Sequence, residues 1–304
     1  TNVLSENQSS ILEGPTLEVI GTTPVPGLGV STDEISNKAT ISNSEIIEQT
    51  QAINMTEVLE SQAPSLMIGD VQNNPYQPNL YYRGFISSPL LGAPQGLSVF
   101  QDGVRINEPF GDVVNYDLIP MNAISNATLM SGSNPLFGLN TLGGALSLRT
   151  KSGNDYPGID SSVLTGSWGR NKLDFANGGK SGDLDYFFAG SFFEEDGWRD
   201  YSPSDVKQGF FKIGWENDFT DFDLSYVNVN SDLIGNGVLP VSMATQRRSQ
   251  AYTIYDQTTN HLDMAILNGS HMINDNYLLS GVVYWKISGF QKMFHYHVLC
   301  FLSS

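Results

Sequence analysis

The 304-residue sequence predicts an α+β domain followed by antiparallel β-strands. Helix and strand patterns alternate up to about residue 152, whereas helical periodicity is absent from residue 153 onward. In this second part, segments of about ten residues alternate apolar and polar side chains and are separated by Gly, Asn, Asp and Ser. Such segments suit the strands of a transmembrane β-barrel, or those of a soluble β-sandwich.

Composition limits the classes of partner. The formal net charge is −17, so nucleic acid is not an expected partner. The acidic excess is spread along the chain, which indicates a solvated surface or a lumen that attracts cations. Cys300 is the sole cysteine, so no internal disulfide bond can form. No apolar run of about 18 residues predicts a transmembrane helix, and the polar start at Thr1 shows no signal-peptide pattern.

Residues 1–30 are rich in Ser, Thr, Pro and Gly, which predicts an extended, flexible segment. One short apolar alternation, Thr16–Thr22, lies within it. A β-like run in a flexible tail can add a strand to the sheet edge of a partner, and a plain linker is the alternative interpretation.

Residues 31–152 predict one small unit of helices and strands. Asn54 and Glu57 form a capping-box pattern at the start of a helix, and Pro64 ends that helix. Asp102-Gly103 is a hairpin signal between two short strands. The expected strands are residues 39–42, 66–71, 80–83, 97–100, 104–106, 124–130 and 145–150, and the expected helices are residues 44–51 and 54–59.

The segment Asn134–Thr150 combines several glycines with an alternating run that begins at Ala145. A glycine pair that leads into a short strand marks a tight bend or a close approach of two backbones. We therefore expect Gly143 and Gly144 to be structural rather than ligand-binding.

Seven strands are expected after residue 153. They are residues 161–168, 171–178, 184–194, 206–216, 221–230, 260–271 and 277–287. The fourth has Phe211, Ile213 and Trp215 on one face and Lys212 and Glu216 on the other. A transmembrane strand needs about 9–11 residues with one row facing lipid. The long irregular stretch of residues 231–256 suits an extracellular loop, and residues 290–304 lose the alternation.

Four motifs, taken in order, resemble the TonB-dependent outer-membrane receptors. Tyr82-Arg83-Gly84-Phe85 is similar to the short Arg-Gly strand end of the family, and Val99–Asn107 is similar to its V-x-x-D-G-V hairpin. Residues 107–111 and 115–120 resemble a sub-group, related to ferric-siderophore and ferric-dicitrate receptors, whose plug carries the core FGLNTLGGALSLRTK. Residues 136–151 match that core closely, and the resemblance covers about residues 39–152.

The resemblance implies an α+β plug domain followed by antiparallel transmembrane β-barrel strands, which form an incomplete barrel. Residues 1–30 would be a flexible N-terminal segment, residues 31–152 the plug, residues 153–289 the first barrel strands and residues 290–304 an atypical or truncated tail. Plugged transporters have about 22 strands, so we expect the N-terminal part of a longer receptor. The implied structural motif of the plug comprises Arg83, Gly84, Asp102, Gly103, Gly132, Gly138, Gly143 and Gly144.

The resemblance also implies partners. Leu17, Glu18, Val19, Ile20 and Gly21 become a TonB-box-like run, which would add a strand to the periplasmic energy-coupling protein TonB. Arg83 would pair with a carboxylate of the barrel wall, or it is an ordinary arginine at a strand end. Ser131 stands before Gly132, where many plugs of the family carry arginine, so a second such contact is not expected.

The expected ligand is scarce and external, and the protein would lie among the lipids of the outer membrane of a Gram-negative bacterium. A ferric siderophore is the leading expectation, with cobalamin, another metal chelate or an oligosaccharide as alternatives. Loop tips at residues 73–78 and 87–95 would face it, and the candidate contacts are Tyr76, Tyr81, Phe85 and Gln95.

No catalytic, cofactor or metal site is expected, because the chain contains none of the common catalytic or phosphate-binding motifs. Two other classes stay open: a receptor that signals, and a soluble β-rich surface protein that binds glycans or other cells.

Overall fold

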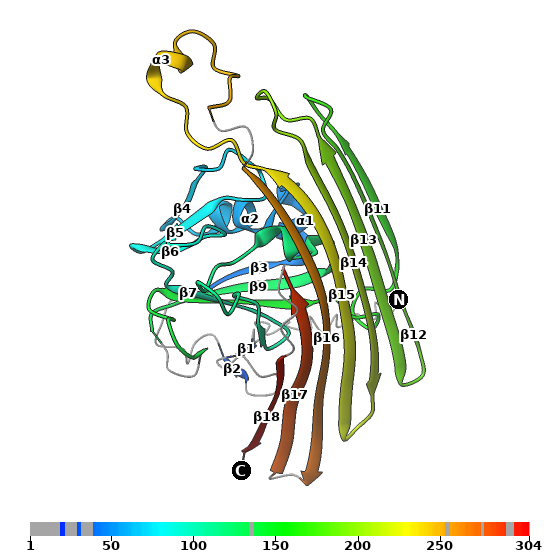
Figure 1. Cartoon of the computed structure of the whole chain (residues 1–304). Coiled ribbons are helices and arrows are strands. Elements are labelled where there is room, and N and C mark those ends of the chain that lie inside the picture. The colour runs from blue at the N-terminus through cyan, green and yellow to red at the C-terminus, as the bar shows by residue number, and fades with distance from the viewer. Residues whose placement is uncertain are drawn as a thin grey trace, which may run out of the picture.

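The computed structural model describes residues 19–21, 29–31, 39–133, 137–252, 256–274, 277–289 and 295–303. A small α/β domain packs against one face of a tall antiparallel sheet (Figure 1). The sheet curves around the domain, and we call it the wall. The face of the wall that contacts the domain is its inner face.

The α/β domain is built on a five-stranded sheet of order β3-β9-β10-β7-β8. Its strands are β3 (Ala39–Asn43), β9 (Ile124–Ser131), β10 (Gly144–Thr150), β7 (Leu97–Gln101) and β8 (Val104–Arg105). β10 pairs parallel with β7, and the other pairs are antiparallel. A smaller sheet contains β4 (Leu66–Gly69), β5 (Asn79–Tyr82) and β6 (Phe85–Ser87). The expected strands of this domain are all present, and β6 is an additional short strand.

Two α-helices and two single turns complete the domain: α1 (Ser44–Thr50), α2 (Met55–Gln62), η2 (Tyr116–Leu118) and η3 (Met121–Ala123). The expected capping box opens α2. The Asn54 side chain accepts hydrogen bonds from the backbone N–H groups of Thr56 and Glu57, and Glu57 accepts one from Ile53 N at 3.0 Å. Apolar residues on one side of α2, such as Val58 and Leu59, are fully buried and anchor the helix in the core.

The wall has eight antiparallel strands in sequence order. They are β11 (Gly158–Thr165), β12 (Asn171–Ser181), β13 (Leu184–Glu195), β14 (Ser204–Glu216), β15 (Thr220–Ile234), β16 (Gln257–Asn274), β17 (Tyr277–Ser288) and β18 (His295–Ser303). Each of the seven expected segments overlaps one of β11–β17. The sequence pattern predicts no strand after residue 289, yet β18 pairs with β17 through its backbone. Backbone pairing does not require alternating side chains, which explains why the pattern missed it.

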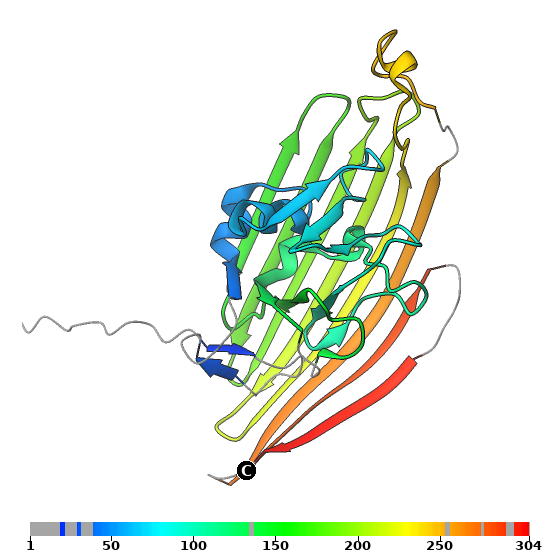
Figure 2. The ribbon, with the colours of Figure 1, turned by 90° about the vertical axis from the view of Figure 1, so that its left-hand side faces the viewer.

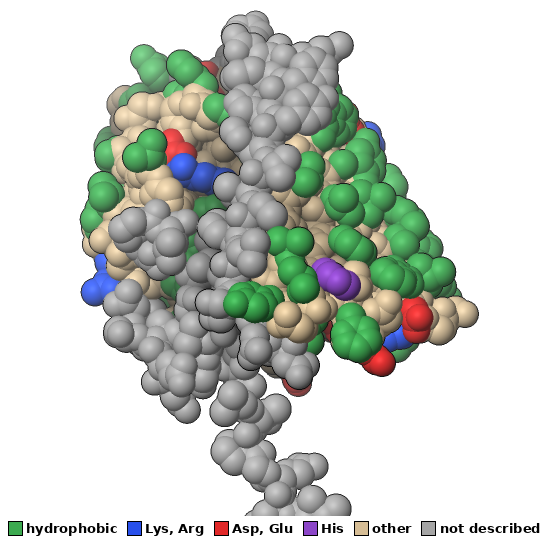
Figure 3. Space-filling view, turned by 90° about the horizontal axis from the view of Figure 1, so that it is seen from below, with side chains coloured by type: hydrophobic (Ala, Val, Ile, Leu, Met, Phe, Trp, Pro, Cys, Tyr) green, Lys and Arg blue, Asp and Glu red, His purple; other side chains and the backbone are tan. Residues whose placement is uncertain are grey.

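Side chains alternate strictly between the two faces of the wall. On β13, Phe187 and Phe193 face inward and are 2% exposed, whereas Phe188 and Phe192 face outward and are 37% and 54% exposed. Figure 3, which views the molecule from below, shows hydrophobic side chains gathered on the outer side of the wall. This surface has the apolar outer row that a membrane strand requires.

The outward apolar rows form a belt of limited height. They run from Leu184 to Phe192 on β13 and from Phe222 to Tyr226 on β15, and the next outward residues are Glu194 and Asn228. The longer row, on β13, covers about nine residues, which in a strand tilted by about 45° span about 20 Å, comparable with the apolar band of outer-membrane barrels. Both strands continue above this belt.

The loops divide between the two ends of the wall. Short turns at residues 182–183 and 217–219 lie at the lower end, and the longer loop that contains α3 (Val241–Ala244) rises above the upper end (Figures 1 and 2). The hairpin of β1 (Val19–Gly21) and β2 (Gly29–Ser31) lies toward the lower end. Among the described residues, no helix has the length and apolar character needed to cross a membrane.

Candidate functional site

The contact between the α/β domain and the wall is the main candidate for function, because it joins the two parts of the chain. A hydrophobic cluster lies at its centre, where Val104, Leu118 and Ala123 of the domain pack against inward side chains of the wall. The wall contributes Ala176, Phe187, Ala189, Phe210, Val227, Val229, Leu262, Met264, Ile266 and Val282. Polar contacts surround this cluster.

Asp102 connects the β7–β8 hairpin to both parts of the molecule. Asp102 and Gly103 have φ angles of 45° and 85°, as a tight hairpin turn requires. The Asp102 carboxylate accepts hydrogen bonds from Thr150 N at 2.9 Å and Thr150 Oγ1 at 2.6 Å. Its backbone carbonyl accepts one from Asn268 Nδ2 of β16 at 3.2 Å. This aspartate therefore does more than shape the turn, because it ties β10 and the wall to the hairpin.

Gly143 and Gly144 of the glycine-rich core stand where a side chain would clash with its neighbours. A Cβ atom on Gly144 would lie 2.2 Å from the Met130 carbonyl oxygen, and the residue has a φ of 154°. A Cβ on Gly143 would lie 2.7 Å from the Phe85 ring, and one on Gly96 would lie 2.6 Å from the same ring. These glycines leave room for one aromatic ring and for close pairing of β9 and β10.

Asp117 of η2 makes the most buried polar contact with the wall. Its side chain is fully buried and accepts hydrogen bonds from Ser231 Oγ of β15 and, at 3.0 Å, from Asn260 Nδ2 of β16. Its backbone carbonyl accepts one from Gln208 Nε2 of β14 at 2.7 Å. Burial raises the pKa of the Asp117 carboxyl, and the two side-chain hydrogen bonds oppose that rise.

An ion pair between buried Lys286 and partly buried Glu108 joins the domain to the wall near β17. Lys286 Nζ lies 3.1 Å from Glu108 Oε1 and also donates to the Ile106 carbonyl at 3.1 Å. Ser288 Oγ donates to Glu108 Oε2 at 2.6 Å. The acid belongs to the domain and the cation to the wall, which is the reverse of the arginine–carboxylate polarity expected for Arg83.

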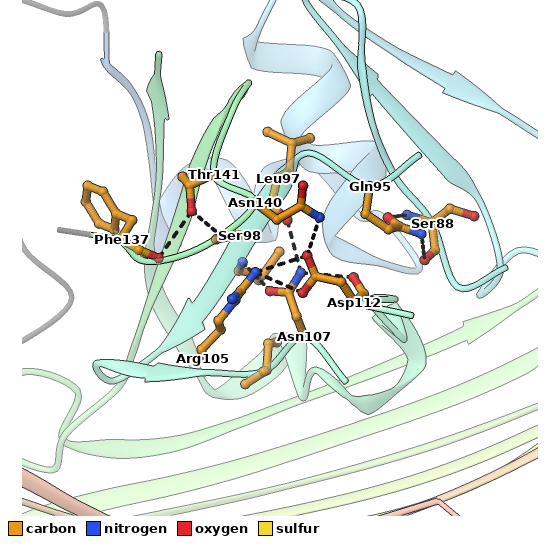
Figure 4. A network of polar contacts seen from close by, with 12 residues as sticks. Ser88, Gln95, Leu97, Ser98, Arg105, Asn107, Asp112, Phe137, Asn140 and Thr141 are labelled. Carbon is orange, nitrogen blue, oxygen red and sulfur yellow. Dashed lines mark hydrogen bonds and ion pairs between the residues drawn. The ribbon is translucent and has the colours of Figure 1, made fainter. Parts of the chain in front are cut away.

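A polar network holds the segment after β8 against the glycine-rich segment (Figure 4). Arg105 Nη2 donates to both oxygens of Asp112, at 2.8 and 3.1 Å. Asn140 Nδ2 donates to the same carboxylate at 2.7 Å, and Ser98 Oγ shares a 2.6 Å hydrogen bond with Thr141 Oγ1. The network fixes one side of the domain independently of the wall.

The loop of residues 70–78 reaches the upper end of the wall. Asn74 Nδ2 donates to Ser204 Oγ at 2.8 Å, and Gln77 Nε2 donates to Thr258 Oγ1 at 2.9 Å. Tyr76 is only 2% exposed, and its ring packs edge-on against Phe193 with centroids 5.0 Å apart. The expectation that Tyr76 is an accessible ligand contact is therefore wrong, because the wall covers it.

Gln95 is also buried, and its side chain forms hydrogen bonds within the domain. It accepts a hydrogen bond from Ser88 N at 2.9 Å and donates to Ser88 O at 3.0 Å, so it closes the loop between β6 and β7. Its amide is thus already hydrogen-bonded within the fold, and its contact with a ligand stays a prediction. Tyr81 and Phe85 are half-buried, with Tyr81 over Gly69 and Phe85 over the glycine core. Their contact with a ligand stays a prediction.

Arg83 and Gly84 form the exposed turn between β5 and β6, with φ angles of 51° and 88°. Within the described ranges Arg83 forms no ion pair, so its pairing with a barrel carboxylate stays a prediction. The remaining motif glycines, Gly132 and Gly138, have φ angles of 92° and 81°. Gly132 N donates to Gly143 O at 3.1 Å, which closes the bend before β10.

The TonB-box-like run lies partly in β1. Val19, Ile20 and Gly21 pair antiparallel with β2, whereas Leu17 and Glu18 lie outside the described residues. The run therefore has strand conformation where it is described.

The described part of the chain contains no group of three His, Cys, Asp or Glu side chains able to hold a metal ion. The polar side chains described above join the α/β domain to the wall. Asp117, Glu108 and Lys286 were missed by the sequence reasoning. The available signal was a long polar side chain, such as Gln208 or Lys286, in the strand row opposite the outward apolar row.

Comparison with known proteins agrees with this architecture. Residues 31–145 match the family model of the TonB-dependent Receptor Plug Domain. The unliganded ferric citrate transporter FecA is similar, with a TM-score of 0.69 and 15% identity over 84% of this chain and 40% of FecA. BauA, the ferric preacinetobactin receptor from Acinetobacter baumannii, has a TM-score of 0.69 and 13% identity over 89% of this chain and 40% of BauA. The ferric-catecholate import receptor Fiu from E. coli K12, in its open form, has a TM-score of 0.66 and 16% identity over 90% of this chain and 44% of Fiu. The chain thus spans less than half the length of these receptors, and the likeness is one of fold.

Proposed function

Because this chain carries the plug domain and part of the barrel of the TonB-dependent receptors, which are transporters of the Gram-negative outer membrane, we propose that it belongs to a receptor that imports a ferric siderophore. The observation that carries the proposal is the arrangement of the two parts. A folded plug packs on the inner face of a sheet whose outer face is a belt of apolar side chains. A lumen closed by a plug needs energy to open.

The plug connects the two ends of the wall, which suits energised transport. Its loop of residues 70–78 contacts the upper ends of β14 and β16, and its N-terminal side leads toward β1 at the lower end. We place the ligand at the upper end and TonB at the lower end. TonB would bind Leu17–Gly21 by strand addition, pull on the plug and open a path along the wall.

A ferric siderophore is proposed as the ligand on the evidence of similar folds. FecA, BauA and Fiu are described as handling ferric citrate, ferric preacinetobactin and ferric catecholates. The apolar belt and the plug are common to the fold, so they support transport in general. The choice of an iron chelate as the ligand rests on the similarity to FecA, BauA and Fiu.

Uptake in cells tests the proposal. The full-length receptor is produced in a Gram-negative strain that lacks its own siderophore receptors, and import of radioactive iron is measured for a panel of ferric siderophores. We expect uptake of at least one chelate, lost when TonB is deleted. Uptake that persists without TonB contradicts the energised mechanism, and no uptake of any ferric chelate contradicts the proposed ligand.

A peptide experiment tests the TonB contact by itself. A peptide of residues Glu13–Pro24 is titrated with the purified periplasmic domain of TonB. Ile20→Pro removes a backbone donor and should abolish binding, whereas Ile20→Val keeps the donor and the β-branched side chain and should bind as the parent peptide does. Equal binding of all three peptides would show that strand addition at this run is not the mode of contact.

A further inference from the structure

Two carboxylates of the wall converge over a glycine on the inner face, near the lower end. Asp185 of β13 and Asp223 of β15 flank Gly214 of β14, which stands opposite each of them in the sheet. A Cβ atom on Gly214 would lie 2.2 Å from Asp185 Oδ2 and 2.9 Å from Asp223 Oδ1. Because the glycine has no side chain, a small space remains there with one oxygen of each carboxylate at its edge. We call this space the cradle.

The two oxygens at the cradle are free of hydrogen bonds from the described residues. Asp185 is buried, and it accepts a hydrogen bond from Gly153 N at 2.8 Å through its other oxygen, Oδ1. Lys212 Nζ lies 3.8 Å from Asp223 Oδ2, which is also the other oxygen and is too far for a hydrogen bond. Both carboxylates therefore keep one oxygen available to a ligand.

Asn268 of β16 brings a third oxygen to the same row. It stands opposite Asp223 in the sheet and is only 8% exposed. Its Nδ2 atom donates to the Asp102 carbonyl oxygen of the plug at 3.2 Å, and this contact with an acceptor shows which end of the amide is the nitrogen. Asn268 Oδ1 has no hydrogen-bond partner among the described residues. A buried oxygen of this kind is stabilised by a ligand that accepts its lone pair.

Negative charge exceeds positive charge around the cradle. Five carboxylates and two cations interact electrostatically here, namely Asp102, Asp185, Asp221, Asp223 and Glu216 against Lys212 and Arg149. The complementary ligand is therefore a cation, since an anion would be repelled by the carboxylates.

The three oxygens indicate the class of cation. Ca²⁺ binds carboxylate and amide oxygens at about 2.3–2.6 Å in a flexible geometry, whereas Mg²⁺ demands a near-ideal octahedron at about 2.0–2.1 Å. Ligands that come from three different strands suit the flexible geometry. The site differs from a cluster of three His, Cys, Asp or Glu side chains, which the described residues do not contain, because its third ligand is an amide.

We propose that the cradle binds Ca²⁺ through Asp185 Oδ2, Asp223 Oδ1 and Asn268 Oδ1, with water molecules completing the coordination. The site belongs to the wall and is independent of the imported ligand, so it goes beyond the proposed function.

The bound ion also acts on the plug. Asp185 accepts its hydrogen bond from Gly153, in the linker between β10 and β11, and Asn268 donates to Asp102 of the β7–β8 hairpin. An ion that fixes both side chains therefore stiffens the contact of the wall with the linker and with the hairpin.

Calcium binding by the full-length receptor in detergent tests the inference. The receptor is first stripped of metal with a chelator, and bound radioactive calcium is then counted by equilibrium dialysis. Gly214→Ala keeps all three ligands but fills the cradle with a methyl group, and Asp223→Asn keeps the shape but removes one charge. We expect each variant to bind one Ca²⁺ fewer than the parent receptor, whose Kd at this site should be on the order of 10⁻⁴ M.

Asp160→Asn is the matched control, because Asp160 is an exposed acid on the inner face of β11, opposite Ala176. It removes the same charge from the same face and should bind as much calcium as the parent. Lys212→Met should tighten calcium binding several-fold, since it removes a cation next to Asp223. Equal calcium stoichiometry in the parent, Gly214→Ala and Asp223→Asn would overturn the inference. Displacement of the ion by an equal concentration of Mg²⁺ would overturn the assignment to Ca²⁺.

Hydrogen exchange tests the effect on the plug. Calcium should slow amide exchange of residues 101–104 in the parent receptor and in Asp160→Asn, but not in Gly214→Ala. Calcium binding at the cradle that leaves exchange of this hairpin unchanged would overturn the proposed stiffening of the plug–wall contact.

Discussion

Gly144 shows how one residue without a side chain determines the core of the plug. Its backbone φ of 154° and the Met130 carbonyl oxygen, 2.2 Å from a built Cβ, leave no room for alanine. Gly138 has a φ of 81° but nothing within 4 Å of a built Cβ. The two glycines belong to one motif in the sequence but differ in backbone conformation and in their surroundings.

We expect Gly144→Ala to prevent stable pairing of β9 and β10, because the clash is with backbone atoms and cannot be relieved by a side-chain rotation. Gly138→Ala should cost only about 1 kcal/mol, the usual cost of a left-handed conformation without glycine. Thermal unfolding of the full-length receptor measures both. Equal midpoints for the two variants would contradict the steric explanation.

Asp117 makes the plug–wall contact depend on pH. Burial raises the pKa of its carboxyl in the folded protein, whereas the unfolded chain has an ordinary value of about 3.9. Below that value both states are protonated. As the pH rises further, the unfolded chain loses its proton first, so stability falls through this interval and stays lower above it.

The variant Asp117→Asn should keep one oxygen to accept from Ser231 and Asn260 while removing the charge. We expect its thermal midpoint to change less than that of the parent receptor between about pH 4 and pH 8. Asp117→Ala should lose both hydrogen bonds and cost about 1–3 kcal/mol at low pH, and less at high pH because it also removes the buried charge. Parallel pH profiles for the parent and Asp117→Asn would show that this carboxyl does not titrate with unfolding.

At the scale of elements, β17 and the segment after β8 are held together by Glu108 and Lys286. Lys286→Met would leave the partly buried Glu108 carboxylate without its cation, and we expect a cost of about 1–3 kcal/mol. The double variant Lys286→Met/Glu108→Gln should cost less than the two single variants together, which a double-mutant cycle measures.

Hydrogen exchange provides the structural readout for that cycle. Lys286→Met should speed amide exchange in residues 104–115 of the plug, while exchange in the α2 helix stays unchanged because α2 packs within the plug core. Faster exchange throughout the plug would show that the pair supports the whole domain rather than this segment.

Local sequence patterns predicted most of the helices and strands. They did not predict contacts between residues that are far apart in the sequence. Alternation identified β11–β17, most clearly β13–β15, where each strand has one largely buried and one largely exposed face. It missed β6, which has three residues, and β18, whose pairing depends on β17. Tyr76 was expected in an exposed loop because its neighbours are turn-forming residues. The ring that covers it, Phe193, belongs to a strand far along the sequence.

The plug–wall contacts escaped prediction for the same reason. Glu108 and Lys286 are separated by 178 residues, and no local period relates them. The family resemblance supplied the idea that a charged pair joins plug and wall, but it suggested arginine on the plug. Only the register of β17 shows that the cation here is on the wall.

At the scale of the whole molecule, the apolar belt defines which surface meets lipid. Ile213 and Trp215 are outward residues of β14 within the belt, and Glu194 of β13 lies above it. A charge within the belt must be removed from water, whereas one above the belt stays solvated.

We therefore expect Ile213→Arg to destabilise the receptor in lipid bilayers by about 2–4 kcal/mol and Glu194→Arg by less than about 1 kcal/mol. Urea-induced unfolding of the full-length receptor from liposomes measures the difference. If both variants were tolerated equally, the outer face of β14 would not be the lipid contact, and a soluble β-rich protein would become the better interpretation.

The position of β3 has a mechanical consequence. It is the edge strand of the five-stranded sheet, it follows the N-terminal segment directly, and it is paired only with β9, from Ala39 to Asn43. A tension applied to the chain before Ala39 is therefore borne first by this short row of hydrogen bonds. The interior strands, held by Asp102 and by the glycine core, carry the load only after that row has parted. Such a plug would yield stepwise from one edge rather than leave the lumen as a rigid body.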